Sequence, residues 1–167
     1  MKASMKKVFT LFLMIGLTAL VAKETPDFIF KYWKNTTKIT HDTIESDAHN
    51  AFLDIYVNEL AKDAYLQEKT LFPVGSIVYK PLYADPYRKQ FARLVIMVKM
   101  KKGYDPKNGD WWYGVYDESG TDMYYQGRIR SCIVCHEQGK ETDYMFSKSV
   151  NKRIDKMLFN SKRSWKK

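Results

Sequence analysis

The residues best suited to chemistry are two cysteines and a histidine in the segment Cys132-Ile133-Val134-Cys135-His136. This C-x-x-C-H spacing is the attachment motif of a c-type haem. The two thiols lie one helical turn apart, so each can bond to one vinyl group of the same porphyrin. The adjacent His136 imidazole can then bind the iron as its proximal ligand. The segment therefore predicts one covalent haem c, with His136 as the metal ligand.

A C-x-x-C pair also occurs in thioredoxin-like dithiols, in zinc sites and as a structural disulfide. A zinc site needs further Cys or His ligands, and the chain has only two cysteines, with His41 and His49 as its other histidines. A dithiol outside the cytoplasm tends to become a disulfide. The spacing of the cysteines leaves these alternatives open, but haem c also accounts for the adjacent histidine.

Residues 1–22 have the pattern of a secretory signal, with three lysines followed by an uncharged apolar run over residues 8–22. That run is short for a membrane span. Ala22 suits the last position before cleavage, whereas Leu20 is large for its position, so an uncleaved N-terminal membrane anchor is the alternative. We expect a periplasmic protein, which agrees with the haem prediction because haem c is attached outside the cytoplasmic membrane.

The charge of the chain is concentrated at its C-terminal end. The formal net charge is +9, yet residues 23–147 hold 17 basic and 18 acidic residues, whereas residues 148–167 hold eight basic residues and one acidic residue. We therefore divide the mature chain into one domain over 23–147 and a basic helix or tail over 148–167. A neutral domain excludes nucleic-acid binding. The tail is a solvated helix end, or it contacts anionic lipid or an acidic redox partner.

The hydrophobic pattern predicts an α+β fold, with an antiparallel β-sheet core and short flanking helices around a single haem c. Residues 91–100 form the clearest strand, because alternation places Leu94 and Ile96 on one face and Val95 and Met97 on the other. Residues 41–50 are polar and predict a loop, and the haem motif predicts a short helical turn. The predicted helices are 26–38, 59–67 and 148–159, and the predicted strands are 51–57, 76–80, 91–100, 111–116 and 121–126.

Three stretches taken in order resemble the cytochrome P-460 family of exported haem c proteins. They are residues 72–80 (FPVGSIVYK), residues 94–116 with the sequence GDWW at 109–112, and SCIVCH at 131–136 followed by TDYMF at 142–146. The resemblance covers residues 50–147 and implies a mostly antiparallel β fold. In that family the lysine that ends the second strand is bonded to the haem macrocycle, and Lys80 matches it.

The resemblance also implies a five-coordinate iron, whose open face binds a nitrogen substrate in the hydroxylamine-oxidising members. A sister group, the beta-type cytochromes c′, shares the fold, lacks the cross-link and binds nitric oxide. Hydroxylamine-oxidising relatives have an arginine on the strand before the helix at 59–67. Here that strand reads Phe52-Leu53-Asp54-Ile55, so the polar group of the distal face is not assigned.

Several candidate residues have alternative interpretations. Lys80 is the haem cross-link or an exposed lysine at a strand end, since lysine is rarely buried. His49 is a distal acid or base or a solvated loop histidine, and Phe72 could cap the distal face. Trp111, Trp112, Tyr113 and Tyr116 are more consistent with hairpin and homodimer packing than with an electron relay. The candidates for a sixth iron ligand are His41, His49, Met97, Met123 and Met145.

The sequence thus predicts an exported monohaem cytochrome whose open haem binds and oxidises a small nitrogen species such as hydroxylamine, with electrons passing to a periplasmic redox partner. Two alternatives remain. The first is a nitric oxide-binding protein that performs no catalysis. The second is a simple periplasmic electron carrier, which would need a strong sixth ligand.

Overall fold

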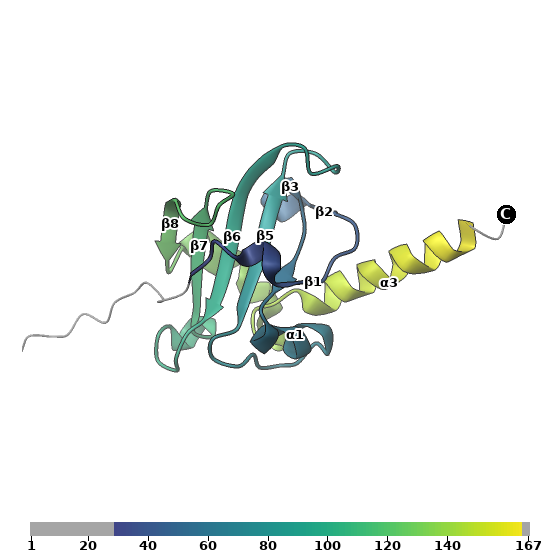
Figure 1. Cartoon of the computed structure of the whole chain (residues 1–167). Coiled ribbons are helices and arrows are strands. Elements are labelled where there is room, and N and C mark those ends of the chain that lie inside the picture. The colour runs from purple at the N-terminus through teal and green to yellow at the C-terminus, as the bar shows by residue number, and fades with distance from the viewer. Residues whose placement is uncertain (1–28, 165–167) are drawn as a thin grey trace, which may run out of the picture.

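The computed structural model describes residues 29–164 of the 167-residue chain, and the side chains of residues 29–155. The predicted secretory signal lies outside the described residues. Among residues 29–164, no helix is long and apolar enough to cross a membrane. The fold is α+β, as predicted, and consists of an eight-stranded antiparallel sheet with short helices around it (Figure 1).

The sheet has the strand order β1-β4-β5-β6-β7-β8, with β2 paired to β3 and β3 paired to β5. Its long central strands β5, β6 and β7 are paired in sequence order, as in a meander. The strands are β1 (Thr37–Lys38), β2 (Ile44–Ser46), β3 (Ala51–Leu53), β4 (Tyr56–Val57), β5 (Ile77–Tyr83), β6 (Phe91–Lys99), β7 (Trp111–Tyr116) and β8 (Met123–Gly127).

Both faces of the central strands are buried. One face carries Val78, Val95 and Met97, and the other carries Ile77 and Ile96. This division confirms the predicted alternation in β6 and places Lys80 of β5 on the first face, opposite Val95 in the register. The first face is therefore the one on which the candidate site can form.

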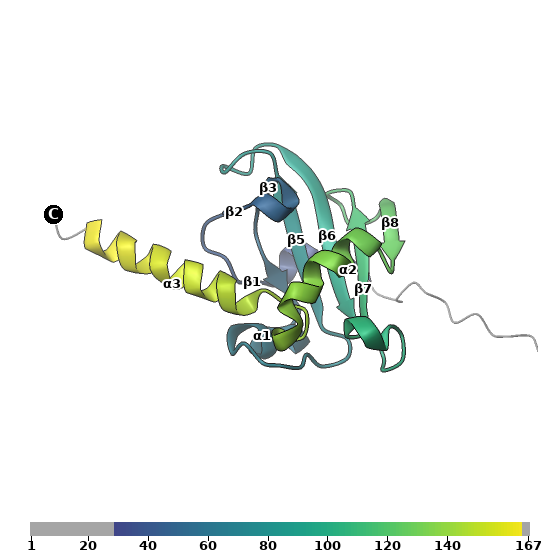
Figure 2. The same cartoon turned by 180° about the vertical axis from the view of Figure 1, so that it is seen from behind.

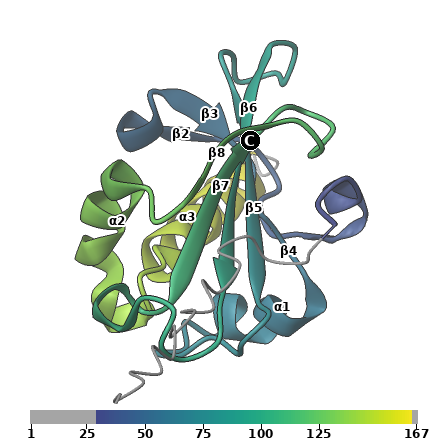
Figure 3. The same cartoon turned by 90° about the vertical axis from the view of Figure 1, so that its left-hand side faces the viewer.

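Different segments cover the two faces. The short helix α2 (Arg130–His136) and the 3-10 helix η4 (Glu137–Thr142) lie across the first face (Figure 2), and Figure 3 shows them beside the sheet in edge view. The other face is covered by the segment that leads into the 3-10 helix η1 (Trp33–Asn35). In this segment Phe30 stacks on Trp112, with ring centroids 5.7 Å apart. The haem motif thus lies directly over the face that carries Lys80.

Two helices lie at the end of the sheet where the chain leaves β4. Helix α1 (Glu59–Leu66) begins at Asn58, whose side chain accepts a hydrogen bond from the Ala61 N–H, as predicted for its N-cap. Helix α3 (Ser147–Ser164) starts beside α1, where the Asn151 side chain donates to the Tyr65 carbonyl, and then projects away from the sheet (Figures 1 and 2). Two further 3-10 helices are η2 (Asp47–His49) and η3 (Pro106–Asn108).

Some predicted elements were wrong. Within the described part of the predicted helix at 26–38, the chain forms only η1 and then β1, because Phe30 and Trp33 are both buried against the sheet and the threonines at 36 and 37 favour extended backbone. The predicted loop at 41–50 contains β2 and η2. Helix α3 is also longer than the predicted helix at 148–159.

The strands around Pro81 also differ from the prediction. The predicted strand at 51–57 is divided into β3 and β4, whereas β5 continues through Pro81 to Tyr83. The proline explains the interruption. The register places Asp54 opposite Pro81, and proline has no N–H to donate to the neighbouring strand. The Asp54 N–H still donates to the Pro81 carbonyl at 3.2 Å. The break in the neighbouring strand therefore accommodates the proline.

Candidate haem-binding site

Two adjoining cavities lie between the first face of the sheet and the segments that cover it. Their volumes are about 280 Å³ and about 250 Å³, and both are lined by Ala48, His49, Cys135 and His136. Because they share these walls, they form one continuous site, of the size at which cofactor pockets of about 300–1,000 Å³ are usually found.

The walls of the site are largely apolar. Leu53 and Ile55 line the larger cavity, and Val95, Val115 and Ile129 line the smaller one. Charged and polar side chains lie among these walls, which is the usual composition of a cofactor pocket. Those of the larger cavity include Ser46, Lys80, Gln138, Ser149 and Arg153, and those of the smaller cavity include Arg93, Tyr113 and Ser131.

The cysteines of the motif lie on α2, which confirms the predicted short helix. Cys132 lines the smaller cavity, and Cys135 lines both. Both thiols are free and partly buried, and burial raises the pKa of the Cys132 thiol. Within residues 29–155, no three His, Cys, Asp or Glu side chains gather closely enough to hold a metal ion. The helix therefore presents two unpaired thiols to one cavity wall, as attachment to one porphyrin requires.

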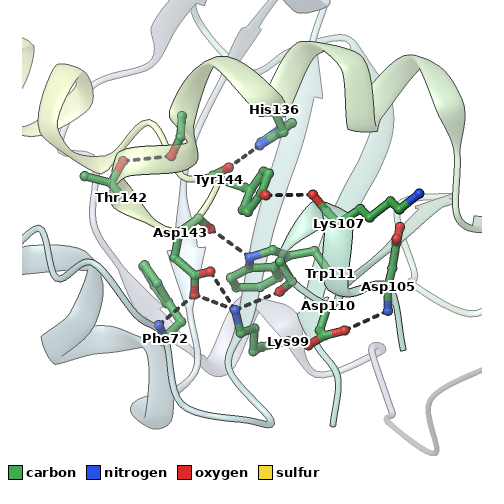
Figure 4. A network of polar contacts seen from close by, with 12 residues as sticks. Phe72, Lys99, Asp105, Lys107, Asp110, Trp111, His136, Thr142, Asp143 and Tyr144 are labelled. Atoms are coloured by element: carbon green, nitrogen blue, oxygen red, sulfur yellow. Dashed lines mark hydrogen bonds and ion pairs between the residues drawn. The ribbon is translucent and has the colours of Figure 1, made fainter. Parts of the chain in front are cut away.

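His136 ends α2 and is 4% exposed. Its Nδ1 lies 2.6 Å from the Tyr144 carbonyl oxygen, which can only accept a hydrogen bond, so Nδ1 carries the proton (Figure 4). This tautomer leaves the lone pair on Nε2 free to bind a metal, and a carbonyl partner of this kind is typical of histidine ligands. Burial, with a smaller contribution from the positive charge of Lys80, lowers the His136 pKa to about 3. The imidazole is therefore neutral at pH 7, as a ligand must be.

Lys80 is only 6% exposed and lines the larger cavity with Cys135 and His136. The alternative of an exposed lysine at a strand end is therefore wrong. Among residues 29–155, no hydrogen bond or ion pair to Lys80 forms, and burial lowers its pKa to about 8. The structure brings this amine to the cavity, and its bond to a haem stays a prediction.

His49, at the end of η2, lines both cavities and is half-buried. Burial, with smaller contributions from the positive charges of Lys80 and Arg93, lowers its pKa to about 4. Its backbone carbonyl accepts a hydrogen bond from Arg93 Nη2 at 3.2 Å. His49 is therefore a cavity residue that is neutral at pH 7, which is compatible with the predicted distal acid or base.

Phe72 is not among the residues that line either cavity, so the prediction that it caps the distal face is wrong. It is 1% exposed and packs edge-on against Tyr65 and Trp111. Its N–H donates to the Asp143 carboxylate at 2.7 Å. The turn before β5 is held in the core by these contacts, which keep its ring away from the site.

The strand before α1 offers an apolar residue to the site. Leu53 lines the larger cavity, whereas Asp54 is fully buried on the other side of the strand, where Arg88 and Lys38 pair with its carboxylate. Of the five candidate sixth ligands, only His49 lines either of these two cavities. His41 and Met123 are exposed, and Met97 and Met145 lie in the core.

Sequence reasoning did not assign Tyr113 to the site. Its ring is 1% exposed, lines the smaller cavity and lies 5.6 Å from the His136 ring between centroids. Its hydroxyl has no hydrogen-bond partner among the described residues. A buried hydroxyl without a partner in a cavity wall is free to bond a polar group of a bound molecule. The sequence pattern could have indicated that Tyr113 belongs to the site. Alternation along β7 places it on the same face as Trp111 and as Val115, which also lines the smaller cavity.

The residues present fit a haem. Two free thiols, one neutral imidazole with a free Nε2, apolar walls and an unpartnered buried hydroxyl all face one site. Cys132 and Cys135 would hold the porphyrin, and His136 would hold the iron.

An antiparallel α+β domain that presents a C-x-x-C-H helix to such a cavity defines a haem c cytochrome. The cytochrome P460 family model matches residues 30–147, so the chain belongs to the cytochrome P460 family. No match was found among curated proteins.

Proposed function

We propose that the protein is an exported haem c oxidoreductase that binds a small nitrogen species, such as hydroxylamine, and oxidises it. The observation that carries this proposal is the position of Lys80, a buried amine that lines one cavity with Cys135 and His136 and has no hydrogen bond or ion pair to any residue of 29–155. In the hydroxylamine-oxidising relatives the matching lysine is bonded to the haem. A haem bound here would supply an iron that accepts electrons from a small ligand and passes them on.

Residues of the chain account for haem attachment, iron binding and proton transfer. Cys132 and Cys135 attach the cofactor, and the Tyr144 carbonyl keeps His136 in the tautomer that binds iron through Nε2. His49 is the one candidate sixth ligand that lines the site, and its low pKa leaves it neutral at pH 7, so it can accept a proton from the substrate. The side chains of Leu53 and Ile55 give the larger cavity an apolar wall.

The activity is tested with the purified haem-loaded protein, hydroxylamine and an artificial electron acceptor. We expect turnover in the wild type, loss of turnover in Lys80→Arg, and retention of covalent haem in both proteins. Lys62→Arg, on the exposed surface of α1, is the matched control and should behave as the wild type. A loaded wild type that does not reduce the acceptor contradicts the proposal.

The position of the apolar Leu53 in the cavity wall supports a second candidate function, the binding of nitric oxide without catalysis. Relatives that oxidise hydroxylamine have an arginine on this strand, whereas here an apolar side chain lines the cavity and Asp54 is paired with Arg88 and Lys38 away from it. An apolar distal face suits a neutral diatomic ligand. A protein that binds nitric oxide tightly and leaves hydroxylamine unchanged would establish this function in place of the first.

The setting that we propose follows from the rest of the chain. The protein is periplasmic, through the signal at residues 1–22, and gives its electrons to a periplasmic redox partner. The exposed tyrosines Tyr124 and Tyr125 on the edge strand β8 offer a surface for a homodimer. A simple electron carrier is the weakest alternative, because neither Met97 nor Met145 lines the site and His49, which does, is assigned here as the distal base.

A further inference from the structure

The turn after the haem motif has an uncommon backbone conformation. Asp143 and Tyr144 are consecutive residues with positive φ angles of 54° and 65°, and neither is glycine. A bulky residue such as tyrosine adopts this conformation only where the surrounding structure holds it there. The turn presents the Tyr144 carbonyl to His136 Nδ1 at 2.6 Å (Figure 4). The strained turn therefore supplies the hydrogen-bond partner of the predicted iron ligand.

A buried ion pair holds the first residue of this turn. Lys99 Nζ, at the end of β6, lies 2.6 Å from both carboxylate oxygens of Asp143, and both side chains are nearly inaccessible to solvent. The Phe72 N–H donates to the same carboxylate at 2.7 Å, and Lys99 also donates to the Gly109 carbonyl at 2.8 Å. The carboxylate thus links the turn to β6 and to the segment before β5.

Three further hydrogen bonds hold the backbone and ring of the turn. The indole N–H of Trp111 donates to the Asp143 carbonyl at 2.7 Å. The Tyr144 N–H donates to the Gly139 carbonyl at 2.8 Å, and the Tyr144 hydroxyl donates to the Lys107 carbonyl at 2.9 Å. The Tyr144 carbonyl is therefore fixed from both sides, by groups that come from β7 and from the helix η4.

We propose that Lys99 and Asp143 are positioning residues for His136: through the Tyr144 carbonyl they fix the tautomer and ring orientation of the imidazole, and so tune the iron that it holds. A buried ion pair by itself is weak evidence of a stabilising role, since apolar replacements often serve as well. This pair has a specific consequence, because the turn that it holds contains the one hydrogen-bond partner of His136 among the described residues. Partners of this kind control the basicity and orientation of a metal ligand.

The chain offers a matched control. Arg88 pairs with the fully buried Asp54 at 2.6 Å, so it is also a cation bound to a buried carboxylate. Arg88 lines neither cavity, and its side-chain hydrogen bonds go to Asp54 and His41, not to the turn at 143–144. Replacement of Arg88 therefore removes a cation from a buried carboxylate, which keeps its pair with Lys38, without disturbing the support of His136.

The test uses the haem-loaded protein and two spectroscopic readouts that do not depend on turnover. The first is the iron–histidine stretching band of the ferrous protein in resonance Raman spectra. The second is the hydrogen-exchange rate of the His136 Nδ1 proton, measured by nuclear magnetic resonance. Lys99→Met removes the ion pair, and Trp111→Phe removes the indole donor to Asp143 while it keeps most of the ring volume. Arg88→Met is the control.

We expect both variants to lower the stretching frequency and to accelerate proton exchange, because an outer partner fixes the orientation of a metal ligand and raises its basicity. Arg88→Met should leave both readouts unchanged. If Lys99→Met does not fold, Trp111→Phe decides alone. Folded variants with the wild-type band and exchange rate would overturn the proposal, and so would an Arg88→Met protein with the same shifts.

The inference rests on the haem part of the proposed function and not on hydroxylamine oxidation. A loaded protein that shows the expected shifts but does not oxidise hydroxylamine would support the positioning role and overturn the proposed activity. Loss of turnover in Lys99→Met with unchanged spectra would mean that the ion pair acts in another way, and would overturn the positioning role. A wild type without covalent haem would overturn both.

Discussion

Lys80 of β5 and His136 of α2 line the same cavity, and each is held toward its uncharged form. Burial is the main cause of the low pKa of both groups, and the positive charge of Lys80 lowers the pKa of His136 further. An uncharged imidazole can bind iron, and an uncharged amine can act as a nucleophile. The fold thus brings a neutral imidazole and a buried amine from distant parts of the chain to one cavity.

The first prediction concerns the attachment of the cofactor. A denatured sample of the exported protein should keep its haem-linked peroxidase stain on a gel, because thioether bonds to Cys132 and Cys135 survive unfolding. The double variant Cys132→Ala/Cys135→Ala should lose the stain, whereas Ser131→Ala, beside the motif, should keep it. Release of the haem from the denatured wild type would contradict the haem c assignment.

The second prediction concerns the coordination of the iron. The ferric protein should give a high-spin electron paramagnetic resonance signal at neutral pH, because Met97 and Met145 are buried away from the cavities. His49→Ala should leave that signal unchanged. A low-spin signal in the wild type would mean that a sixth ligand is bound. Its disappearance in His49→Ala would identify that ligand, and its persistence would favour an electron carrier.

Local patterns were sufficient to predict much of the fold. The alternation of β6 correctly divided Val95 and Met97 from Leu94 and Ile96, and Asn58 correctly marked the start of α1. Both predictions depend on neighbours in the sequence, where the period of the side chains is a direct signal of structure. The order of helices and strands was then enough for the α+β class.

The errors arose where distant contacts determine the local structure. Phe72 is eight residues before Lys80, yet its ring lies in the core because Tyr65, Trp111 and Asp143 hold it there. The buried pair of Lys99 and Asp143 likewise could not be predicted, since nothing near either residue in the sequence indicates the other. Tertiary contacts of this kind leave no periodic signal.

The third prediction concerns Gly109, which lies against the turn that supports His136. An added Cβ at Gly109 would meet the Tyr144 ring at 2.4 Å, whereas an added Cβ at Gly103 would meet nothing within 4 Å. Both glycines have positive φ angles, so both Gly→Ala variants incur backbone strain. Gly109→Ala should therefore be less stable than Gly103→Ala by about 1–3 kcal/mol, the usual cost of overpacking. Urea unfolding measures the difference, and equal midpoints would contradict it.

The fourth prediction concerns the bond between Lys80 and the haem. Trypsin does not cleave between Lys80 and Pro81, so Lys80 lies within the tryptic peptide of residues 70–88. This peptide should not appear free and unmodified, and the haem should carry it through a third bond besides those to Cys132 and Cys135. Lys80→Arg should give an ordinary haem c spectrum, whereas the wild type should have a broad and red-shifted Soret band when reduced. A free and unmodified Lys80 peptide would exclude the cross-link, and nitric oxide binding would then be the better proposal.

The last prediction uses the pH dependence of stability to test whether Lys80 is buried. Burial lowers the pKa of Lys80 to about 8 in the folded protein, below its ordinary value of 10.5. In the haem-free variant Cys132→Ala/Cys135→Ala this amine cannot be consumed by a bond to haem, so it stays free to titrate. Between these values the unfolded chain binds a proton that the folded protein has released. The free energy of unfolding should therefore rise with pH through this window, by at most about 1.4 kcal/mol per pH unit for one proton.

The same measurement in the triple variant with Lys80→Met isolates the contribution of this amine. Buried tyrosines act in the opposite direction at higher pH, since burial raises the pKa of Tyr79 to about 12, but they are common to both proteins and cancel in the difference. The difference in unfolding free energy between the two proteins should change steadily from pH 8 to pH 10.5 and be constant below pH 8. A difference that is constant throughout would mean that Lys80 titrates as an exposed lysine, and its nucleophilic role would then lose its physical basis.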